Sequence, residues 1–279
     1  GDDVTDEAAF EVLGPGDVGV KVGPGQTAAG YRVADQPDVA GLLTELLHQR
    51  KNYMRGKRMA FVVDVPASAS LRDYEAVAHL AHHVEELEET ARGIRPRLGS
   101  RKIWMVSSTA QGGGVAEMLP AVITLLRDLG IPSDWVVIES SEPAFFELTK
   151  QIHNMIHGEG RVELPNGSRE LFERENAANA AFLVQRMKPG DILIVHDPQP
   201  AALAGMIREQ VDTTAVWRCH IGLDSENAST RAAWEFLAPF LDAYDHGVFS
   251  TTEYVPGNFT QRASVITPAI DPLGDKNRE

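Results

Sequence analysis

The sequence predicts an α/β fold, in which a doubly wound parallel sheet spans residues 59–279 and a smaller α/β piece precedes it. Two observations support this prediction. Short, nearly continuous apolar runs alternate with longer segments that carry apolar residues at helical spacing. The apolar runs are typical of parallel strands that helices cover on both faces of the sheet.

The first 50 residues predict a small, separate unit. Residues 3–13 predict a short helix that begins in an acidic loop, since Asp and Glu favour the first turn of a helix. Residues 18–23 and 29–33 predict strands, and residues 39–50 predict a helix with a basic end. The polar, basic stretch KNYMRGKR at 51–58 predicts a linker between two domains.

The larger region begins with a strand at 59–65 and a long amphipathic helix at 70–94. Further strands are predicted at 102–108, 134–140, 191–197, 214–221, 246–251 and 264–270. Helices are predicted at 115–130, 143–158, 171–187, 200–209 and 230–245. This alternation is Rossmann-like, and sheets of this kind bind ligands at the carboxyl ends of their strands.

Composition limits the partners of the chain. The formal net charge is −14 and the pI is near 5.1, which argues against binding to nucleic acid or to anionic membranes. The single cysteine, Cys219, excludes an internal disulfide and fits a reducing cytoplasm. The sequence contains no apolar run of 18 residues and no signal peptide, so we expect a cytoplasmic protein without a membrane span.

A glycine-rich turn lies between the strand at 102–108 and the next helix. Gly112, Gly113 and Gly114 allow the backbone to approach a ligand closely, and the helix that follows offers free N–H groups to an anion. Glu117 stands in the first turn of that helix. The motif is neither GxGxxG nor a phosphate-binding loop with GK[ST], so a tight turn without a ligand remains an alternative.

Two predicted strands end in residues that can bind a sugar. His196 and Asp197 end the strand DILIV, while Arg218 and His220 end the strand TAVWRC. A carboxylate and imidazoles at such strand ends can orient a sugar hydroxyl, and an arginine can reach a phosphate or carboxylate. The alternative is a set of structural hydrogen bonds, and the spacing does not favour a zinc site.

Two polar groups elsewhere are also candidates for binding. Lys150 and Asn154 lie four residues apart on one predicted helix, so they share a face that is either a polar wall of the site or a solvated surface. At the N-terminus, Asp2 and Asp6 lie four residues apart at a loop-to-helix junction, with Asp3 between them. They predict either a Mg²⁺ site or acidic residues that favour the start of a helix.

Residues 1–50 resemble the C-terminal end of trehalose-6-phosphate phosphatases of the haloacid dehalogenase superfamily, through GDDVTDEAAF, VGVKVG and TAAGYRV. The resemblance implies a truncated haloacid dehalogenase-like piece in which Asp2 binds Mg²⁺ directly, Asp6 supports it and Asp3 assists. The nucleophile motif of that family, DxDGT, does not occur in these 279 residues. We therefore expect no phosphatase activity from this chain alone.

Residues 70–279 resemble the N-terminal half of retaining glycosyltransferases of the trehalose synthase type, which have the GT-B fold. The resemblance rests on segments that include VSSTAQGGGVAEML, FFELTKQIHN, VHDPQPAAL, VWRCHIGLD and TPAIDPLGDKN. It implies that Gly113 and Gly114 face a diphosphate and that Glu117, Asp197 and His220 contact the acceptor sugar. HIGLD departs at Gly222 from the HIDLS that this family favours.

Together the two resemblances imply a piece of a bifunctional trehalose-making protein. The whole protein would transfer glucose from a nucleoside diphosphate glucose to glucose or glucose 6-phosphate with retention, and the fused phosphatase would act on trehalose 6-phosphate. We expect Mg²⁺ only in the phosphatase part, no cofactor in the transferase part, and an inactive isolated chain, with a homodimer possible. The alternatives are a non-catalytic module that binds a sugar or a partner, and a hydrolase that works through the acidic N-terminal loop.

Overall fold

The computed structural model describes residues 7–11, 19–44, 60–65 and 69–274. The chain divides into two compact units, Gly1–Lys57 and Arg58–Glu279, which are described separately. The division falls within the stretch 51–58 that the sequence predicts as a linker, and that stretch lies outside the described residues. Within the described ranges, no helix combines the length and the apolar character needed to cross a membrane.

The smaller unit contains helix α1 (Glu7–Glu11), two parallel strands, β1 (Val20–Val22) and β2 (Tyr31–Val33), and helical residues at 36–44. This confirms the predicted strands. Lys21 is only 4% exposed, and its ammonium lies 3.2 Å from a carboxylate oxygen of Glu7. The other oxygen of that carboxylate accepts a hydrogen bond from the Ala28 N–H at 2.8 Å, which lowers the pKa of Glu7. These contacts fasten α1 to the strands.

A seven-stranded sheet forms the centre of the larger unit, in the order β3-β5-β4-β6-β7-β8-β9. Its strands are β3 (Ala60–Val62), β4 (Ile103–Ser107), β5 (Ser133–Ile138), β6 (Ile192–His196), β7 (Thr214–Cys219), β8 (His246–Phe249) and β9 (Ala263–Val265). The prediction of a wholly parallel sheet is wrong at β3, which pairs antiparallel with β5 at the edge of the sheet. A run of apolar residues does not encode strand direction, and antiparallel edge strands are common in such sheets.

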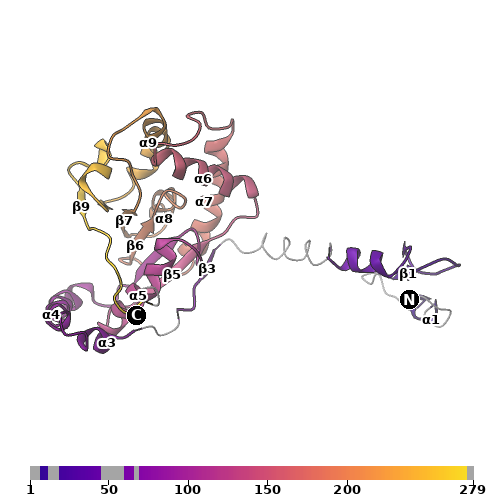
Figure 1. Ribbon diagram of the computed structural model, residues 1–279, viewed down its shortest axis with the longest axis horizontal. Helices are drawn as coiled ribbons and strands as arrows, with labels where there is room; N and C mark the ends of the chain where they lie inside the picture. The colour runs from indigo at the N-terminus through magenta and orange to yellow at the C-terminus, as the bar shows by residue number, and fades with distance from the viewer. Residues whose placement is uncertain (1–6, 12–18, 45–59, 66–68, 275–279) are drawn as a thin grey trace. The chain divides into compact units, whose positions relative to one another are not determined.

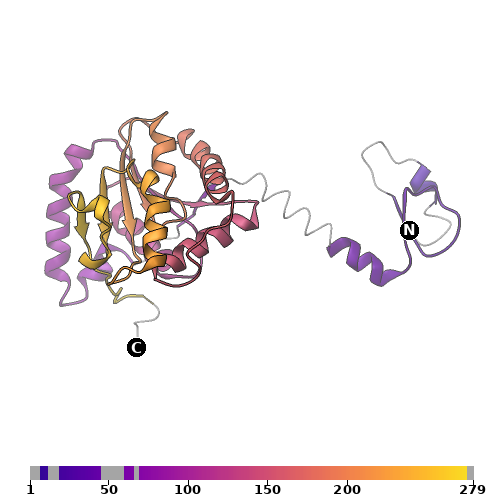
Figure 2. The ribbon, with the colours of Figure 1, turned by 90° about the horizontal axis from the view of Figure 1, so that it is seen from above.

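Helices cover both faces of the sheet (Figure 1). They are α3 (Leu71–Glu75), α4 (Ala81–Leu98), α5 (Gly114–Asp128), α6 (Pro143–Ile156), α7 (Ser168–Val184), α8 (Leu203–Arg208) and α9 (Ala228–Leu241). Helices α6 to α9 pack against the sheet and form one large apolar cluster with it. Helix α5 packs against the sheet in a second apolar cluster. The long helix α4 lies at one edge of this unit in Figure 2 and forms a further apolar layer with α3 and α5.

The segment 70–94 is not the single helix that its periodicity predicts. Helix α3 ends at Glu75, and a turn with hydrogen bonds of the i→i−3 type leads into α4. In one continuous helix, Leu71 and Val84 would point roughly 140° apart at 100° per residue. The break lets both side chains enter the same apolar cluster. Tertiary burial therefore overrides the local helical preference.

The strand order places a topological switch point between β4 and β6. From β4 the chain passes through α5 to β5, and later it returns on the other side of β4 to form β6. In open sheets of this kind, the crevice for a ligand lies outside the carboxyl ends of the two strands that flank the switch point. The glycine-rich turn follows one of these strands, and His196 and Asp197 end the other.

Candidate functional site

Asp197 leaves strand β6 in an unusual backbone conformation. Its φ is 63°, and among the described residues it is the non-glycine residue with positive φ. Asp tolerates this left-handed region better than most residues because its short polar side chain can hydrogen-bond locally. The Asp197 N–H donates to the Arg218 carbonyl at 2.9 Å, and its own carbonyl accepts from the Trp217 indole N–H at 3.0 Å. The turn after β6 is thereby fixed against β7.

The Asp197 carboxylate joins the ends of the two strands. Its Oδ1 accepts a hydrogen bond from the His220 backbone N–H at 2.9 Å. Burial raises the pKa of Asp197 to about 6, against the opposing effects of that hydrogen bond and of the nearby Arg218 charge. The carboxylate therefore places the backbone of His220, in addition to any contact with a ligand.

The two predicted histidines form a pair. His196 Nδ1 lies 3.0 Å from His220 Nε2, and the two rings are nearly parallel, with an angle of 10° between them. His196 is 4% exposed, whereas His220 is partly exposed. Burial, together with the charge of Arg218, lowers the pKa of His196 to about 3 and that of His220 to about 4. Both imidazoles are therefore neutral at pH 7, and His220 is the one that a ligand can reach.

Arg218 is engaged within the sheet. Its Nη1 donates to the Phe249 carbonyl at 2.9 Å and its Nη2 donates to the Ile266 carbonyl at 2.7 Å. Burial lowers the pKa of its guanidinium. The side chain thus ties β7 to β8 and to the end of β9, while its positive charge acts on the histidine pair.

Gly222, where the sequence departs from HIDLS, is in contact with an aromatic ring. A Cβ added at Gly222 would lie 2.2 Å from Cγ of Tyr254, which is in the 3₁₀-helix η1 (Thr252–Tyr254). Next to this contact, the Ser250 hydroxyl donates to the His220 carbonyl at 3.2 Å. The segment that carries His220 is therefore held from the β8 side too. Nothing in the sequence pattern near Tyr254 or Ser250 pointed to these roles.

The glycine-rich turn is open to solvent at the end of β4. Gly112 and Gly113 have φ values of 73° and 90°, and a Cβ on either residue would meet no atom of the described residues within 4 Å. Backbone conformation, and not crowding, is therefore what favours glycine here. Gly114 begins α5, and Glu117 is exposed in its first turn. The turn leaves space for a ligand to approach the N-terminus of the helix.

The predicted polar face on α6 is less directly connected to the site. Lys150 is exposed and Asn154 is partly buried, and among the described residues no hydrogen bond joins their side chains to the histidine pair. The helix nevertheless ends near the loop that follows His220. A Cβ on Gly158 would lie 2.6 Å from Leu223, and the Gly158 carbonyl accepts a hydrogen bond from Asn227 at 2.9 Å.

Helix α7 carries a buried polar face that is not among the predicted site residues. The Asn179 side chain accepts from the Glu139 N–H at 2.9 Å and donates to the Glu139 carbonyl at 2.8 Å. Asn176 is fully buried and donates to the Gln199 carbonyl at 3.3 Å. Glu139 follows β5 and Gln199 follows Asp197 by two residues, so α7 fixes two loops at the carboxyl edge of the sheet. The asparagines at i and i+3 in NAANA are the signal that could have revealed this face.

The predicted magnesium ligands Asp2, Asp3 and Asp6 lie outside the described residues. Within the described part of the chain, no group of three or more His, Cys, Asp or Glu residues could hold a metal ion. The Mg²⁺ site therefore stays a prediction.

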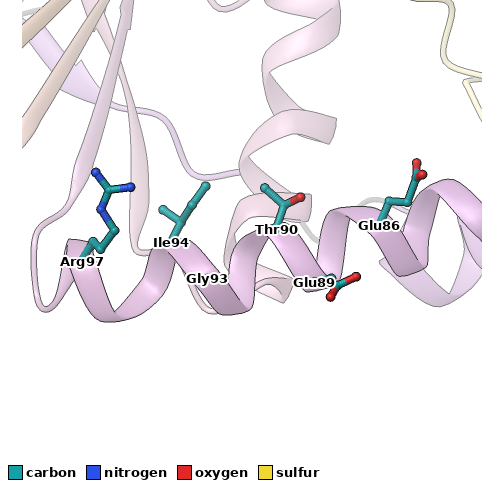
Figure 3. A pocket seen from close by; sticks show the side chains of 6 residues that line it. All are labelled: Glu86, Glu89, Thr90, Gly93, Ile94 and Arg97. Carbon is teal, nitrogen blue, oxygen red and sulfur yellow. The ribbon is translucent and has the colours of Figure 1, made fainter.

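A hollow of about 630 Å³ lies along α4, and none of the predicted site residues of the larger unit lines it (Figure 3). Glu86, Thr90, Ile94 and Arg97 project from one side of the helix, while Gly93 and Glu89 complete the lining. The residues that line it all belong to one helix. We therefore place the chemistry at the carboxyl edge of the sheet.

A comparison with protein families identifies one that covers the site. The family described as "Trehalose synthase, N-terminal domain" matches residues 105–256, which is more than half of the chain and includes the end of β4, all of β6 and β7, and the histidine pair. This chain belongs to that family.

The chain is also similar to individual trehalose synthases and to a trehalose phosphorylase. The chain is 36% identical over 235 residues to a trehalose synthase of Pyrococcus horikoshii, covering 84% of this chain and 51% of the relative. It is 34% identical over 216 residues to a trehalose synthase of Rubrobacter xylanophilus, covering 76% and 49%. A trehalose phosphorylase of Pleurotus pulmonarius is 28% identical over 230 residues, covering 72% and 30%. The chain thus spans about half the length of the trehalose synthases that it matches.

Among solved structures, the chain is similar to a trehalose-phosphate synthase of Burkholderia vietnamiensis. The TM-score is 0.49 and the identity is 16%, over 62% of this chain and 50% of that one.

Proposed function

We propose that residues 59–279 form the acceptor-binding half of a retaining, GT-B-type glycosyltransferase that makes trehalose. The observation that carries the proposal is the match to the N-terminal domain of trehalose synthases, which spans the histidine pair and the glycine-rich turn. The location of these groups at the carboxyl edge of a doubly wound sheet supports it, because such sheets bind ligands there.

In this proposal, His220 and Asp197 place the acceptor sugar, which is glucose or glucose 6-phosphate. His220 presents a neutral imidazole to a sugar hydroxyl, since burial and the Arg218 charge lower its pKa to about 4. Asp197 fixes the backbone of His220 through the bond at 2.9 Å, and His196 holds the ring at 3.0 Å, so the imidazole does not have to be ordered when the sugar binds. Correct placement of the attacking hydroxyl is what this half contributes to the transfer.

The donor in this proposal is a nucleoside diphosphate glucose. The turn at Gly112–Gly114 faces its diphosphate, and three features support this role: the turn is exposed, has space above it and ends at the N-terminus of a 15-residue helix. Arg218 contributes positive charge from within the sheet. Transfer with retention requires the donor and the acceptor hydroxyl to meet on one face of the sugar, and the switch point between β4 and β6 is where sheets of this kind bind ligands.

Titration of the chain with glucose and with glucose 6-phosphate tests the acceptor site. We expect saturable binding, and we expect His220→Ala to weaken it by about 10-fold through the loss of one hydrogen bond. The matched control is His83→Ala, because His83 is 70% exposed on α4. Equal binding by the His220→Ala variant would exclude the assigned site.

The alternative is a module that binds a sugar or a partner chain without contributing to transfer. Both proposals predict sugar binding, so binding alone does not separate them. The discriminating measurement uses a protein that contains this chain together with the donor-binding half of its family. Transfer of glucose that His220→Ala lowers supports the enzyme, whereas transfer that is insensitive to the variant supports the module.

For residues 1–50 we propose a haloacid dehalogenase-like piece in which Asp2 and Asp6 bind Mg²⁺, with Asp3 assisting. Carboxylates are ligands that Mg²⁺ prefers. Calorimetric titration with Mg²⁺ should show weak binding that Asp2→Asn removes. Binding that persists in an Asp2→Asn, Asp6→Asn double variant would contradict the site. Incubation with trehalose 6-phosphate should release no phosphate, since the DxDGT nucleophile motif is absent from the sequence.

A further inference from the structure

The short contact between His196 and His220 restricts where their protons can be. Nδ1 of His196 and Nε2 of His220 are 3.0 Å apart, a distance at which one nitrogen must donate and the other accept. The rings lie within 10° of parallel, which allows the N–H of one ring to point in-plane at the lone pair of the other. A neutral imidazole has one N–H, so the direction of this bond decides which nitrogen is protonated on both rings.

Two arrangements are then possible. In the first, the proton is on His196 Nδ1, His196 Nε2 is a bare acceptor, and His220 carries its proton on Nδ1. In the second, the proton is on His220 Nε2, so His196 must carry an N–H at Nε2 and His220 Nδ1 is bare. The two arrangements give His220 opposite properties toward a ligand, a donor in the first and an acceptor in the second.

The environment of His196 Nε2 discriminates between them. This atom is buried, and within the described part of the chain it has no hydrogen-bond partner. Among backbone groups, a buried N–H without a partner is rarer than a buried carbonyl that lacks one, and we apply the same preference to the imidazole nitrogens. The first arrangement leaves only an acceptor without a partner, whereas the second buries an N–H. His220 Nδ1, by contrast, is not among the buried atoms without partners, and its residue is partly exposed.

We infer that His196 is a positioning residue that holds His220 in the Nδ1–H tautomer, so that His220 presents an N–H donor outward. His196 donates from Nδ1 to His220 Nε2 and makes no contact of its own with a ligand, because it is only 4% exposed. This revises the substrate-binding role that the sequence predicts for His196. It rests on the proposed function in one respect only, namely that the group that meets His220 is a sugar.

A definite chemical role for His220 follows. With Nδ1 protonated and Nε2 already accepting a hydrogen bond, the ring has no free lone pair and cannot accept the proton of an attacking hydroxyl. The Nδ1–H of His220 can instead donate a hydrogen bond to an oxygen of the acceptor, either a hydroxyl or a phosphate oxygen. Burial is the main cause of the lowered pKa of both imidazoles, and the charge of Arg218 adds to it, so the pair stays neutral and the single-proton arrangement is preserved.

Long-range ¹⁵N–¹H NMR of the histidine-labelled chain at pH 7.5 tests the inference directly. The spectra distinguish Nδ1–H from Nε2–H imidazoles, and the variant His220→Gln assigns the signal among the nine histidines. We expect a single Nδ1–H form for His220. In His196→Leu, which removes the donor, we expect that single form to be lost. In His196→Asn, whose side-chain amide can donate from the same place, we expect it to be retained.

An Nε2–H form of His220 in the unmodified chain would overturn the inference, and so would an Nδ1–H form that persists in His196→Leu. The spectra of the unmodified chain decide between the two tautomers even if a variant fails to fold. Glucose titration then separates this inference from the proposed function. The tautomer result stands without sugar, whereas absence of sugar binding by a chain with the Nδ1–H form would contradict only the proposed function.

Discussion

Acid should destabilise the larger unit through its buried histidine pair, and His196→Asn should remove about half of that effect. The pKa values are lowered in the folded chain to about 3 for His196 and about 4 for His220, from 6.5 for an unperturbed imidazole. The unfolded chain therefore binds more protons below pH 6.5. The stability that the pair contributes is present above pH 6.5 and is lost as the pH falls toward the folded pKa values.

The magnitude follows from the same values. At pH 5, each histidine is largely protonated in the unfolded chain and neutral in the folded chain. Each of the two therefore lowers the unfolding free energy by about 2 kcal/mol relative to pH 8, so the pair lowers it by about 4 kcal/mol. Asp197 acts in the opposite direction. Its pKa is raised to about 6, so protonation stabilises the fold by about 1 kcal/mol at pH 5 relative to pH 8. The three groups together should cost about 3 kcal/mol at pH 5.

Urea unfolding followed by tryptophan fluorescence measures this effect. All four tryptophans, Trp104, Trp135, Trp217 and Trp234, belong to the larger unit, so the signal reports on that unit alone. Between pH 8 and pH 5, His196→Asn should lose about 2 kcal/mol less than the unmodified chain. His83→Asn, at a site that is 70% exposed on α4, should leave the pH dependence unchanged. An unaltered pH dependence in His196→Asn would refute the reasoning.

Three further predictions concern the stability of the larger unit in variants of Gly222, Asp197 and Arg218, which hold the site residues in place. Gly222→Ala should destabilise the larger unit by about 1–3 kcal/mol because its Cβ would overlap the Tyr254 ring. The control in urea unfolding is Gly257→Ala, whose Cβ meets no atom within 4 Å in the part of the chain that the structure describes. Asp197→Ala should cost about 2–4 kcal/mol, since it loses the acceptor for the His220 N–H and retains a positive φ. Asp197→Asn should cost less than half as much, and equal losses would contradict the role of the side-chain oxygen. Arg218→Lys should destabilise by about 1–3 kcal/mol through loss of one of the two carbonyl bonds, and unchanged stability would show that these bonds contribute nothing.

The fold could be predicted where burial alone decides structure. The predicted strands at 102–108, 191–197 and 214–221 correspond to β4, β6 and β7, because continuous apolar runs are typical of strands covered on both faces. The direction of β3 and the break after Glu75 could not be predicted. The first depends on the partner strand, and the second depends on Leu71 and Val84 sharing one apolar cluster.

The site was predicted as residue positions but not as contacts. Alternation of strands and helices brought His196, Asp197 and His220 to the same edge of the sheet, and the structure joins them by hydrogen bonds. The packing of Tyr254 on Gly222 and the pairing of Asn179 with the Glu139 backbone depend on side chains that meet across the fold. No local pattern in the sequence predicts such contacts between residues that are distant along the chain.

The most direct test of the central claim, that the carboxyl edge of this sheet binds an acceptor sugar, is to follow the His220 imidazole resonances while glucose and glucose 6-phosphate are added into the millimolar range. We predict a saturable shift of the His220 signal with at least one of the two sugars, and no such shift for the exposed His82 and His83. No change at His220 with either sugar, in a chain shown to be folded, would contradict the claim.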